Sequence, residues 1–239
     1  MPFQAVASQR LFQQVADQIA GLIRSGELAP GTRLPAERDL SKKLGVSRPI
    51  VREAMIALEL SGLVEVRTGT GAYVCAKSAR STELRDVGPS ALELLAARRV
   101  IEGEIAACAA IAAKDKDIER LDEALAWYRR EYLKGEDCYE ADRAFHIGLA
   151  EATGNAVFVH IVEQFWGDMR GPIFNRLGEL TKNNAKLRTN MSDHENIRNA
   201  VAQHDVDGAR RTMQAHIANV EVYFFDGLGK QGKTRRKTE

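Results

Sequence analysis

Helical periodicity governs the sequence from residue 89 to residue 225. Apolar side chains recur there every three or four positions, and no stretch alternates between apolar and polar residues as a half-buried strand does. The expected helices cover residues 89–113, 116–134, 137–152, 155–179, 185–203 and 206–225. Without strands between these helices a parallel sheet cannot form, so residues 89–226 are predicted to be an all-α helical bundle.

The first 75 residues follow a different plan. Apolar spacing predicts a helix over residues 11–25, a second over 35–44, and a third that begins after Ser47, a favourable N-cap residue. The segment LVEVRTGTGAYV then predicts a strand, a glycine-rich turn and a returning strand. Three helices followed by a small β wing predict a winged helix-turn-helix domain over residues 1–75 in a mainly α chain.

A helix-turn-helix places the N-terminal end of its second helix in the major groove of DNA. Arg48 and Arg52 lie at that end, where a guanidinium can reach phosphates or donate two hydrogen bonds to guanine. Arg38 opens the preceding helix, on the side expected to face the DNA backbone. We therefore expect these three arginines to contact DNA.

The net charge of +1 hides an uneven distribution. Residues 1–80 carry +4 (11 Lys/Arg against 7 Asp/Glu), residues 81–226 carry −7 (18 against 25), and the last 13 carry +4 (5 against 1). Residues 76–88 are polar and aperiodic and are predicted to be a linker, and the basic tail 227–239 is predicted to be disordered. No apolar run approaches the roughly 18 residues of a membrane span and no signal pattern opens the chain, so we expect a cytoplasmic protein without a membrane partner.

The motifs LPAERDL, VSRPIVREA and GLVEVRTGTGAYV resemble the winged-helix domain of the GntR family of bacterial transcription regulators. The resemblance covers nearly all of residues 8–75 and implies operator binding as a homodimer. By motif position it adds DNA contacts to those of the three arginines, namely Ser47, Pro49, Ile50, Thr68 and Gly69. Pro49 departs from the hydroxyl or small residue that is common there, and it removes a possible donor.

A second pattern concerns the histidines of the helical bundle. In the segment DRAFH, Asp142 and His146 lie four residues apart and share one face of a helix with Phe145 and Leu149. His194 and His216 fall on the apolar stripes of two later helices. Four inward polar side chains in one bundle need partners, because unpaired burial costs a few kcal/mol. A divalent cation and a hydrogen-bonded polar cluster both meet this need.

The segments ELLAARRVIEGEIAACAA, DRAFHIGLAEATGN, SDHENIRNAV and RRTMQAHI resemble the ligand-binding domain of the FadR subfamily, the FCD type. The resemblance implies that an aspartate and three histidines hold one divalent metal ion per chain. Zn²⁺ is expected first, with Ni²⁺ or Mn²⁺ as alternatives, and a carboxylate effector takes the free coordination positions. Arg98 lies on the inward stripe and suits a two-point grip on that carboxylate. The alternatives are an ion pair of Arg98 with Glu102, and Arg99 as the effector residue.

These patterns predict a metabolite-responsive transcription regulator, a repressor rather than an enzyme. The rival interpretation is a metal-dependent hydrolase or lyase fused to a DNA-binding module, and a third is a DNA-bending protein without a ligand. The chain has no HExxH motif, which disfavours the enzyme. Because the sequence looks most similar to regulators of hexuronate catabolism, a hexuronate or other sugar acid is the first expected effector. A short organic acid such as lactate or pyruvate is the second.

Overall fold

The computed structural model describes residues 10–67, 70–76, 88–181 and 184–225. Within these residues the chain forms ten helices and one two-stranded sheet, and it separates into two compact units. The first unit contains α1–α3, both strands and α8. The second contains α4–α7, α9 and α10. The mainly α fold, with a winged helix-turn-helix before a helical bundle, is confirmed.

The first unit is built on α1 (Leu11–Arg24) and α3 (Arg48–Leu60), which pack against each other. The buried face of α1 follows the predicted spacing and includes Phe12, Val15 and Ile19. Between these two helices in the sequence, α2 spans Glu37–Leu44, so it begins two residues later than the predicted helix over 35–44. Pro35 lies before the helix, and the extended residue Ala36 occupies the N-cap position.

The turn between α2 and α3 has the geometry that the sequence predicted. Gly45 ends α2 in the left-handed conformation with a φ of 67°, which a residue with a side chain adopts only at a cost. The Ser41 hydroxyl donates to the Val46 carbonyl across the turn at 2.6 Å. Ser47 is the N-cap residue of α3, although its side chain makes no capping hydrogen bond.

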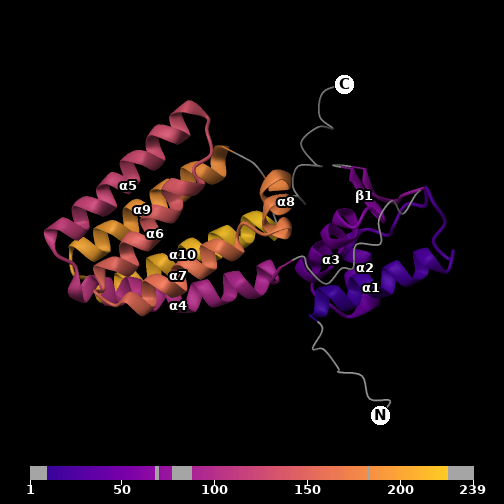
Figure 1. The fold of residues 1–239 in the computed structure, drawn as a ribbon, viewed down its shortest axis with the longest axis horizontal. Helices are drawn as coiled ribbons and strands as arrows, with labels where there is room; N and C mark the ends of the chain where they lie inside the picture. The colour runs from indigo at the N-terminus through magenta and orange to yellow at the C-terminus, as the bar shows by residue number, and fades with distance from the viewer. Residues whose placement is uncertain (1–9, 68–69, 77–87, 182–183, 226–239) are drawn as a thin grey trace, which may run out of the picture. The chain divides into compact units, whose positions relative to one another are not determined.

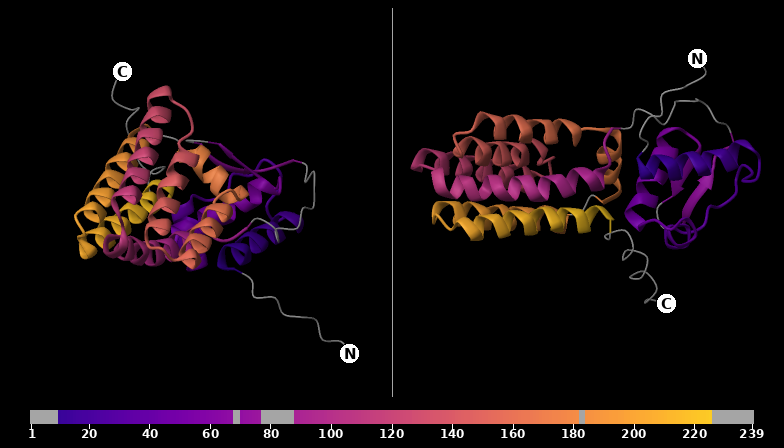
Figure 2. Two further views of the ribbon diagram at one scale, coloured as in Figure 1. Left: turned by 60° about the vertical axis from the view of Figure 1, so that its left-hand side comes forward. Right: turned by 90° about the horizontal axis from the view of Figure 1, so that it is seen from below.

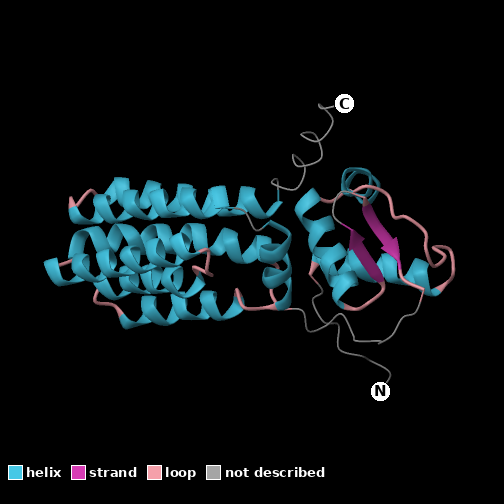
Figure 3. Cartoon of the chain, turned by 90° about the horizontal axis from the view of Figure 1, so that it is seen from above, coloured by secondary structure: helices cyan, strands magenta, loops and turns pink. Residues whose placement is uncertain are grey.

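The wing consists of β1 (Val64–Arg67) and β2 (Gly71–Val74), which pair antiparallel with Val64 opposite Val74. Segment 31–34 flanks the other edge of β2, because Gly31 and Leu34 donate backbone hydrogen bonds to β2 carbonyls at 2.8 Å. Figure 3 shows the two strands lying together beside the helices of this unit. Thr68 and Gly69, the predicted wing contacts, lie outside the described residues.

Long helices form the second unit and lie lengthwise side by side (Figures 1 and 2). They are α4 (Ala91–Ala112), α5 (Asp115–Lys134), α6 (Tyr139–Ala152), α7 (Ala156–Asp168), α9 (Asn184–Ala202) and α10 (Val206–Phe225). The most extensive packing joins α9 to α10 and α5 to α6, and α6 also packs on α7. None of the helices in the described part of the chain is long and apolar enough to cross a membrane.

One predicted helix is wrong. Residues 155–179 were expected to form a single helix, but α7 ends at Asp168 and α8 spans Pro172–Thr181. Proline has no N–H to donate and clashes with the preceding helical turn, whereas it is well tolerated as the first residue of a helix. Gly171 and Pro172 therefore separate two helices, although the apolar periodicity continues across them.

Candidate metal centre and nucleic-acid interface

The four predicted metal ligands come together inside the second unit. Asp142 and His146 lie on α6, His194 on α9 and His216 on α10. Each histidine is at most 2% exposed, so all three rings are removed from solvent. One candidate ligand atom from each of the four side chains lies within 4.8 Å of the other three. Helical periodicity thus identified the faces that converge, although it carried no information on their mutual distances.

The carboxylate of Asp142 lies beside the histidine rings. Its Oδ1 atom is 3.1 Å from His194 Nε2 and 3.5 Å from His146 Nε2. The ring centroids of His146 and His194 are 5.4 Å apart, and those of His194 and His216 are 4.5 Å apart. The aromatic ring of Phe145 packs against His194 with a centroid distance of 4.5 Å and helps to close this cluster.

The hydrogen bonding of the cluster tests whether it suits a metal. Within the described residues, its buried atoms without a partner in hydrogen-bond geometry are Asp142 Oδ1, His146 Nε2, both ring nitrogens of His194, and His216 Nδ1. The contacts of Asp142 Oδ1 with His194 and His146 are thus close approaches without that geometry. An unsatisfied buried polar atom costs about 1–3 kcal/mol of stability. Several such atoms at one place are therefore rare in folded proteins unless a ligand or ion satisfies them. A cation would accept one lone pair from each of the four side chains, and a set of imidazole nitrogens with one carboxylate oxygen suits Zn²⁺, Ni²⁺ or Mn²⁺.

The electrostatics of the cluster favour the forms that bind metals. Burial opposes ionisation of Asp142, but His194 and His146 outweigh it and hold the pKa of the carboxyl well below its usual value. Burial lowers the pKa of His194 and, together with the neighbouring His194, lowers the pKa of His216 to about 4. A carboxylate and neutral imidazoles are the protonation states that coordinate a divalent ion.

His146 is the exception among the three histidines. Burial acts to lower its pKa, but Glu102 and Asp142 outweigh burial and raise it. Glu102 lies on α4, is 1% exposed and contacts His146 Nδ1 through Oε2. No local pattern in the sequence connects Glu102 with a histidine 44 positions away, because Glu102 stood out only as a helical neighbour of Arg98.

A second acidic residue that sequence reasoning missed approaches His216. The Oδ2 atom of Asp193 lies 3.5 Å from His216 Nδ1 and accepts a hydrogen bond from Asn219 at 2.9 Å. Asp193 immediately precedes His194 in the chain, and this adjacency was the only available signal. The Asp193 carboxylate thus lies within ion-pair distance of one candidate ligand, His216.

Arg98, the predicted effector residue, is 2% exposed and adjoins the histidine cluster through Glu102. Its Nε donates to Glu102 Oε1 at 2.5 Å, so the ion pair weighed as an alternative is present. Its Nη1 lies 2.9 Å from the Met169 sulfur, and its guanidinium stacks 5.0 Å from the Trp166 ring. Arg99, the fallback, is instead 47% exposed and lies 3.9 Å from Glu221. Of the two arginines, only Arg98 adjoins the candidate metal centre.

The predicted DNA contacts divide into exposed and buried residues. Arg38 is 75% exposed, Ser47 and Arg48 are exposed, and Pro49 and Ile50 are half-buried at the start of α3. Arg52 differs from the prediction, because it is only 4% exposed. Its Nε and Nη2 donate to the two carboxylate oxygens of Glu37 at 2.9 and 2.5 Å. Arg52 therefore joins α3 to α2 here, and DNA contact would require this ion pair to open.

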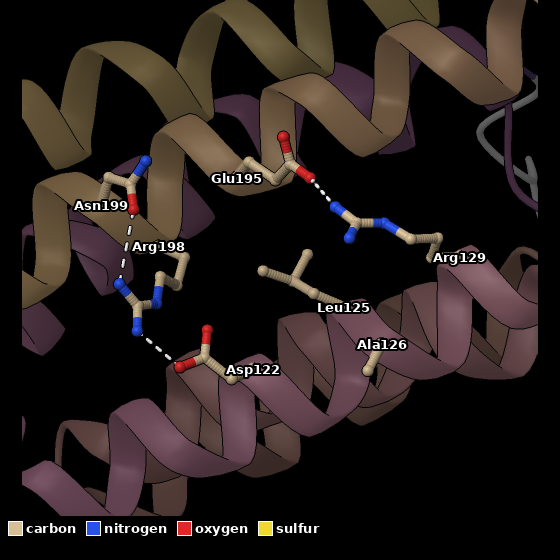
Figure 4. Close-up of a pocket in the computed structure, with 7 residues that line it drawn as sticks. All are labelled: Asp122, Leu125, Ala126, Arg129, Glu195, Arg198 and Asn199. Atoms are coloured by element: carbon tan, nitrogen blue, oxygen red, sulfur yellow. Dashed lines mark hydrogen bonds and ion pairs between the residues drawn. The ribbon is translucent and has the colours of Figure 1, made fainter.

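A groove between α5 and α9 is a second candidate site (Figure 4). Its charged side chains neutralise each other across the groove, since Arg129 donates to Glu195 and Arg198 donates to Asp122, both at 2.5 Å. Leu125 and Ala126 line the space between the two pairs. Both arginines are paired, and Arg198 Nε is the one atom lining the groove that is buried without a hydrogen-bond partner among the described residues. The groove therefore lacks the convergent group of such atoms that distinguishes the histidine cluster.

Two family models match the chain. The model for "Bacterial regulatory proteins, gntR family" matches residues 11–74, and the model for the FCD domain matches residues 93–219. The Uxu operon regulator of Haemophilus influenzae is 36% identical over 91% of this chain and 83% of its own length. The transcriptional regulator LutR of Bacillus subtilis is 32% identical over 84% of this chain and 94% of its own length.

Solved structures agree on the fold. Escherichia coli McbR/YncC superposes with a TM-score of 0.52 at 24% identity, over 92% of this chain and 99% of that chain. The relatives that share more of the sequence are named as transcriptional regulators, so the alternative of a hydrolase or lyase has no support.

Proposed function

This chain belongs to the GntR family of bacterial regulatory proteins and carries an FCD domain, and from that premise we propose a metal-dependent repressor that responds to a carboxylate. It is a transcriptional regulator rather than an enzyme. The proposal adds the metal, the effector and the repression of transcription. We assign DNA binding to residues 1–75 and ligand binding to residues 89–226, and we place the protein in the cytoplasm.

The observation that carries the proposal is the set of buried, unsatisfied atoms shared by Asp142, His146, His194 and His216. These four residues would hold one divalent ion, with Zn²⁺ as the first candidate. When bound, the ion supplies open coordination positions that accept an anionic oxygen. Arg98 lies beside them and offers a guanidinium for a second grip on the same carboxylate.

A sugar acid, and a hexuronate first, is the proposed effector, with a short organic acid as the second candidate. Its support is sequence similarity to relatives named as regulators of the Uxu operon and the Exu regulon, at 34–36% identity over 91% of this chain. A relative named LutR and relatives named NanR are also similar, at 32% and 30% identity. The shared feature of the proposed ligands is a carboxylate, which matches Arg98 and an open metal position.

DNA recognition is assigned to a homodimer of winged helices on a two-fold operator. Arg38, Ser47 and Arg48 are exposed at the ends of α2 and α3 and are the first contacts, and Pro49 and Ile50 adjoin them. The wing tip at Thr68 and Gly69 supplies the remaining contact. The effector would favour a dimer in which the two winged helices no longer match the half-site spacing, so that DNA affinity falls.

Fluorescence anisotropy on the DNA upstream of the chain's own gene tests the proposal. The salt concentration is held fixed, because phosphate contacts make affinity steeply salt-dependent. We expect one acid in a panel of sugar acids and short carboxylates to weaken binding, and a chelator to cancel that effect. His194→Ala should bind DNA without responding to the acid, while the exposed His160→Ala responds normally. Tight DNA binding that no acid alters would contradict the effector proposal.

A further inference from the structure

Glu102 is a buried carboxylate on α4, a helix that contributes none of the four candidate ligands. At 1% exposure it has no access to water, so its charge must be balanced within the protein. Arg98 and His146 are the partners that face it. Arg98 contacts both carboxylate oxygens, but its contact with Oε2 is long at 3.4 Å. The closer contact of Oε2 with the histidine therefore needs a separate explanation.

The two ring nitrogens of His146 have different surroundings. Nδ1 meets Glu102 Oε2, while Nε2 is buried without a hydrogen-bond partner and lies 3.5 Å from Asp142 Oδ1. A carboxylate at Nδ1 holds the proton on that nitrogen and leaves the Nε2 lone pair free. Histidines that bind metals commonly donate their other N–H to a carboxylate, which fixes the ring orientation and makes the ligand more basic.

The contacts of Arg98 extend this arrangement away from the metal centre. Arg98 Nε donates to Glu102 Oε1 at 2.5 Å, and Arg98 Nη2 makes a longer contact of 3.4 Å with Oε2, the oxygen that His146 Nδ1 also approaches. Arg98 Nη1 points instead at the sulfur of Met169. A thioether is a weak acceptor, so a carboxylate arriving at Nη1 would replace a poor partner with a strong one. The guanidinium thus donates to Glu102 through Nε, while its Nη1 atom faces a position where an anion could accept a hydrogen bond.

We propose that Glu102 is a positioning residue, which orients His146 for metal coordination and connects the metal centre to the guanidinium of Arg98. This inference rests on the proposed function, because it concerns the same metal site. Under this inference Glu102 has two roles. It balances the charge of Arg98, and it also orients a metal ligand, which charge balance alone would not require. Metal affinity is therefore the property that should respond to its removal.

The test compares Glu102→Gln with Glu104→Gln in the full-length protein. Glu104 lies on the same helix but is exposed and paired with Arg210, so it controls for loss of a charge on α4. Zn²⁺ affinity is measured by competition with a coloured chelator, and the visible spectrum of the Co²⁺ form reports the coordination geometry. Glu102→Gln should lower Zn²⁺ affinity roughly 10–100-fold and alter the Co²⁺ spectrum, while Glu104→Gln changes neither.

A second variant distinguishes loss of metal affinity from misfolding. Glu102→Gln alone leaves the buried Arg98 uncompensated, whereas Arg98→Gln/Glu102→Gln removes both charges together. This double variant should also lose 10–100-fold in Zn²⁺ affinity, with a melting temperature of the metal-free protein near that of the wild type. Zn²⁺ affinity within twofold of the wild type and an unchanged Co²⁺ spectrum, in either folded variant, would overturn the inference alone. Failure of the wild type to bind Zn²⁺, Ni²⁺ or Mn²⁺ would overturn it together with the metal in the proposed function.

Discussion

Removal of the metal should lower the thermal stability of the second unit substantially. The buried side chains of His146, His194 and His216, together with the carboxylate of Asp142, contain five polar atoms without hydrogen-bond partners. One ion binds one atom of each of the four side chains, so at about 1–3 kcal/mol for each atom the penalty that it can remove is on the order of 4–12 kcal/mol, which water entry and side-chain rearrangement reduce in the metal-free protein. The bound ion removes this penalty in the folded state only.

The expected size of the effect follows from ligand linkage. A ligand at 100 to 1,000 times its dissociation constant stabilises the folded state by about 2.7–4.1 kcal/mol. For a protein of this size, each kcal/mol shifts the melting temperature by roughly 2–4 °C. Addition of Zn²⁺ to chelator-stripped protein should therefore raise the melting temperature by roughly 5–16 °C.

Differential scanning calorimetry measures this shift, and two histidine variants separate specific from general effects. His194→Ala removes a fully buried candidate ligand, so its melting temperature should be insensitive to Zn²⁺. His160→Ala removes an exposed histidine of α7 and should keep the full shift. If stripped wild-type protein melts at one temperature with and without Zn²⁺, Ni²⁺ or Mn²⁺, the buried atoms have other partners and the reasoning is refuted.

Three further predictions concern single residues. Arg48→Ala should weaken operator binding by about 1–3 kcal/mol in anisotropy titrations and leave the Zn²⁺-induced thermal shift intact; loss of both would instead indicate misfolding. Arg52→Ala deprives Glu37 of its partner and should lower the free energy of unfolding in urea by about 1.5–3 kcal/mol, and an unchanged stability would show that the ion pair is dispensable. Burial lowers the pKa of His194, whereas Glu102 and Asp142 outweigh burial and raise that of His146, so His146 is the ligand that must release a proton. Metal affinity should thus fall about tenfold per pH unit as the pH drops below the raised pKa of His146, and a dependence on about three protons would contradict this assignment.

Local patterns in the sequence predicted the features that depend on one helix or one turn. Spacing along the helices placed Asp142, His146, His194 and His216 on inward faces, and the structure brings them together. The turn at Gly45 was equally predictable, because positive φ favours glycine. In each case the signal lies within a few residues of the feature that it predicts.

Pairings between distant segments escaped the same reasoning. Arg52 lies off the apolar stripe of its helix and was expected to face DNA, but Glu37 approaches it from α2. Glu102 and His146 likewise meet across two helices. No local periodicity encodes which carboxylate reaches which cation. The break at Pro172 is a different failure, since the proline was visible but the continuing apolar spacing was given more weight.

The distribution of the ligands over α6, α9 and α10 has a consequence for the lifetime of the folded chain. A bridging ion can bind all four residues only after these helices have packed, because α6 lies far from α9 in the sequence and the chain between them must first close. Such late interactions contribute little to the folding rate and mainly slow unfolding. A bound metal would therefore slow unfolding and lengthen the time for which a folded molecule resists proteolysis. Metal supply would then set how long the molecule persists as well as whether it senses an acid.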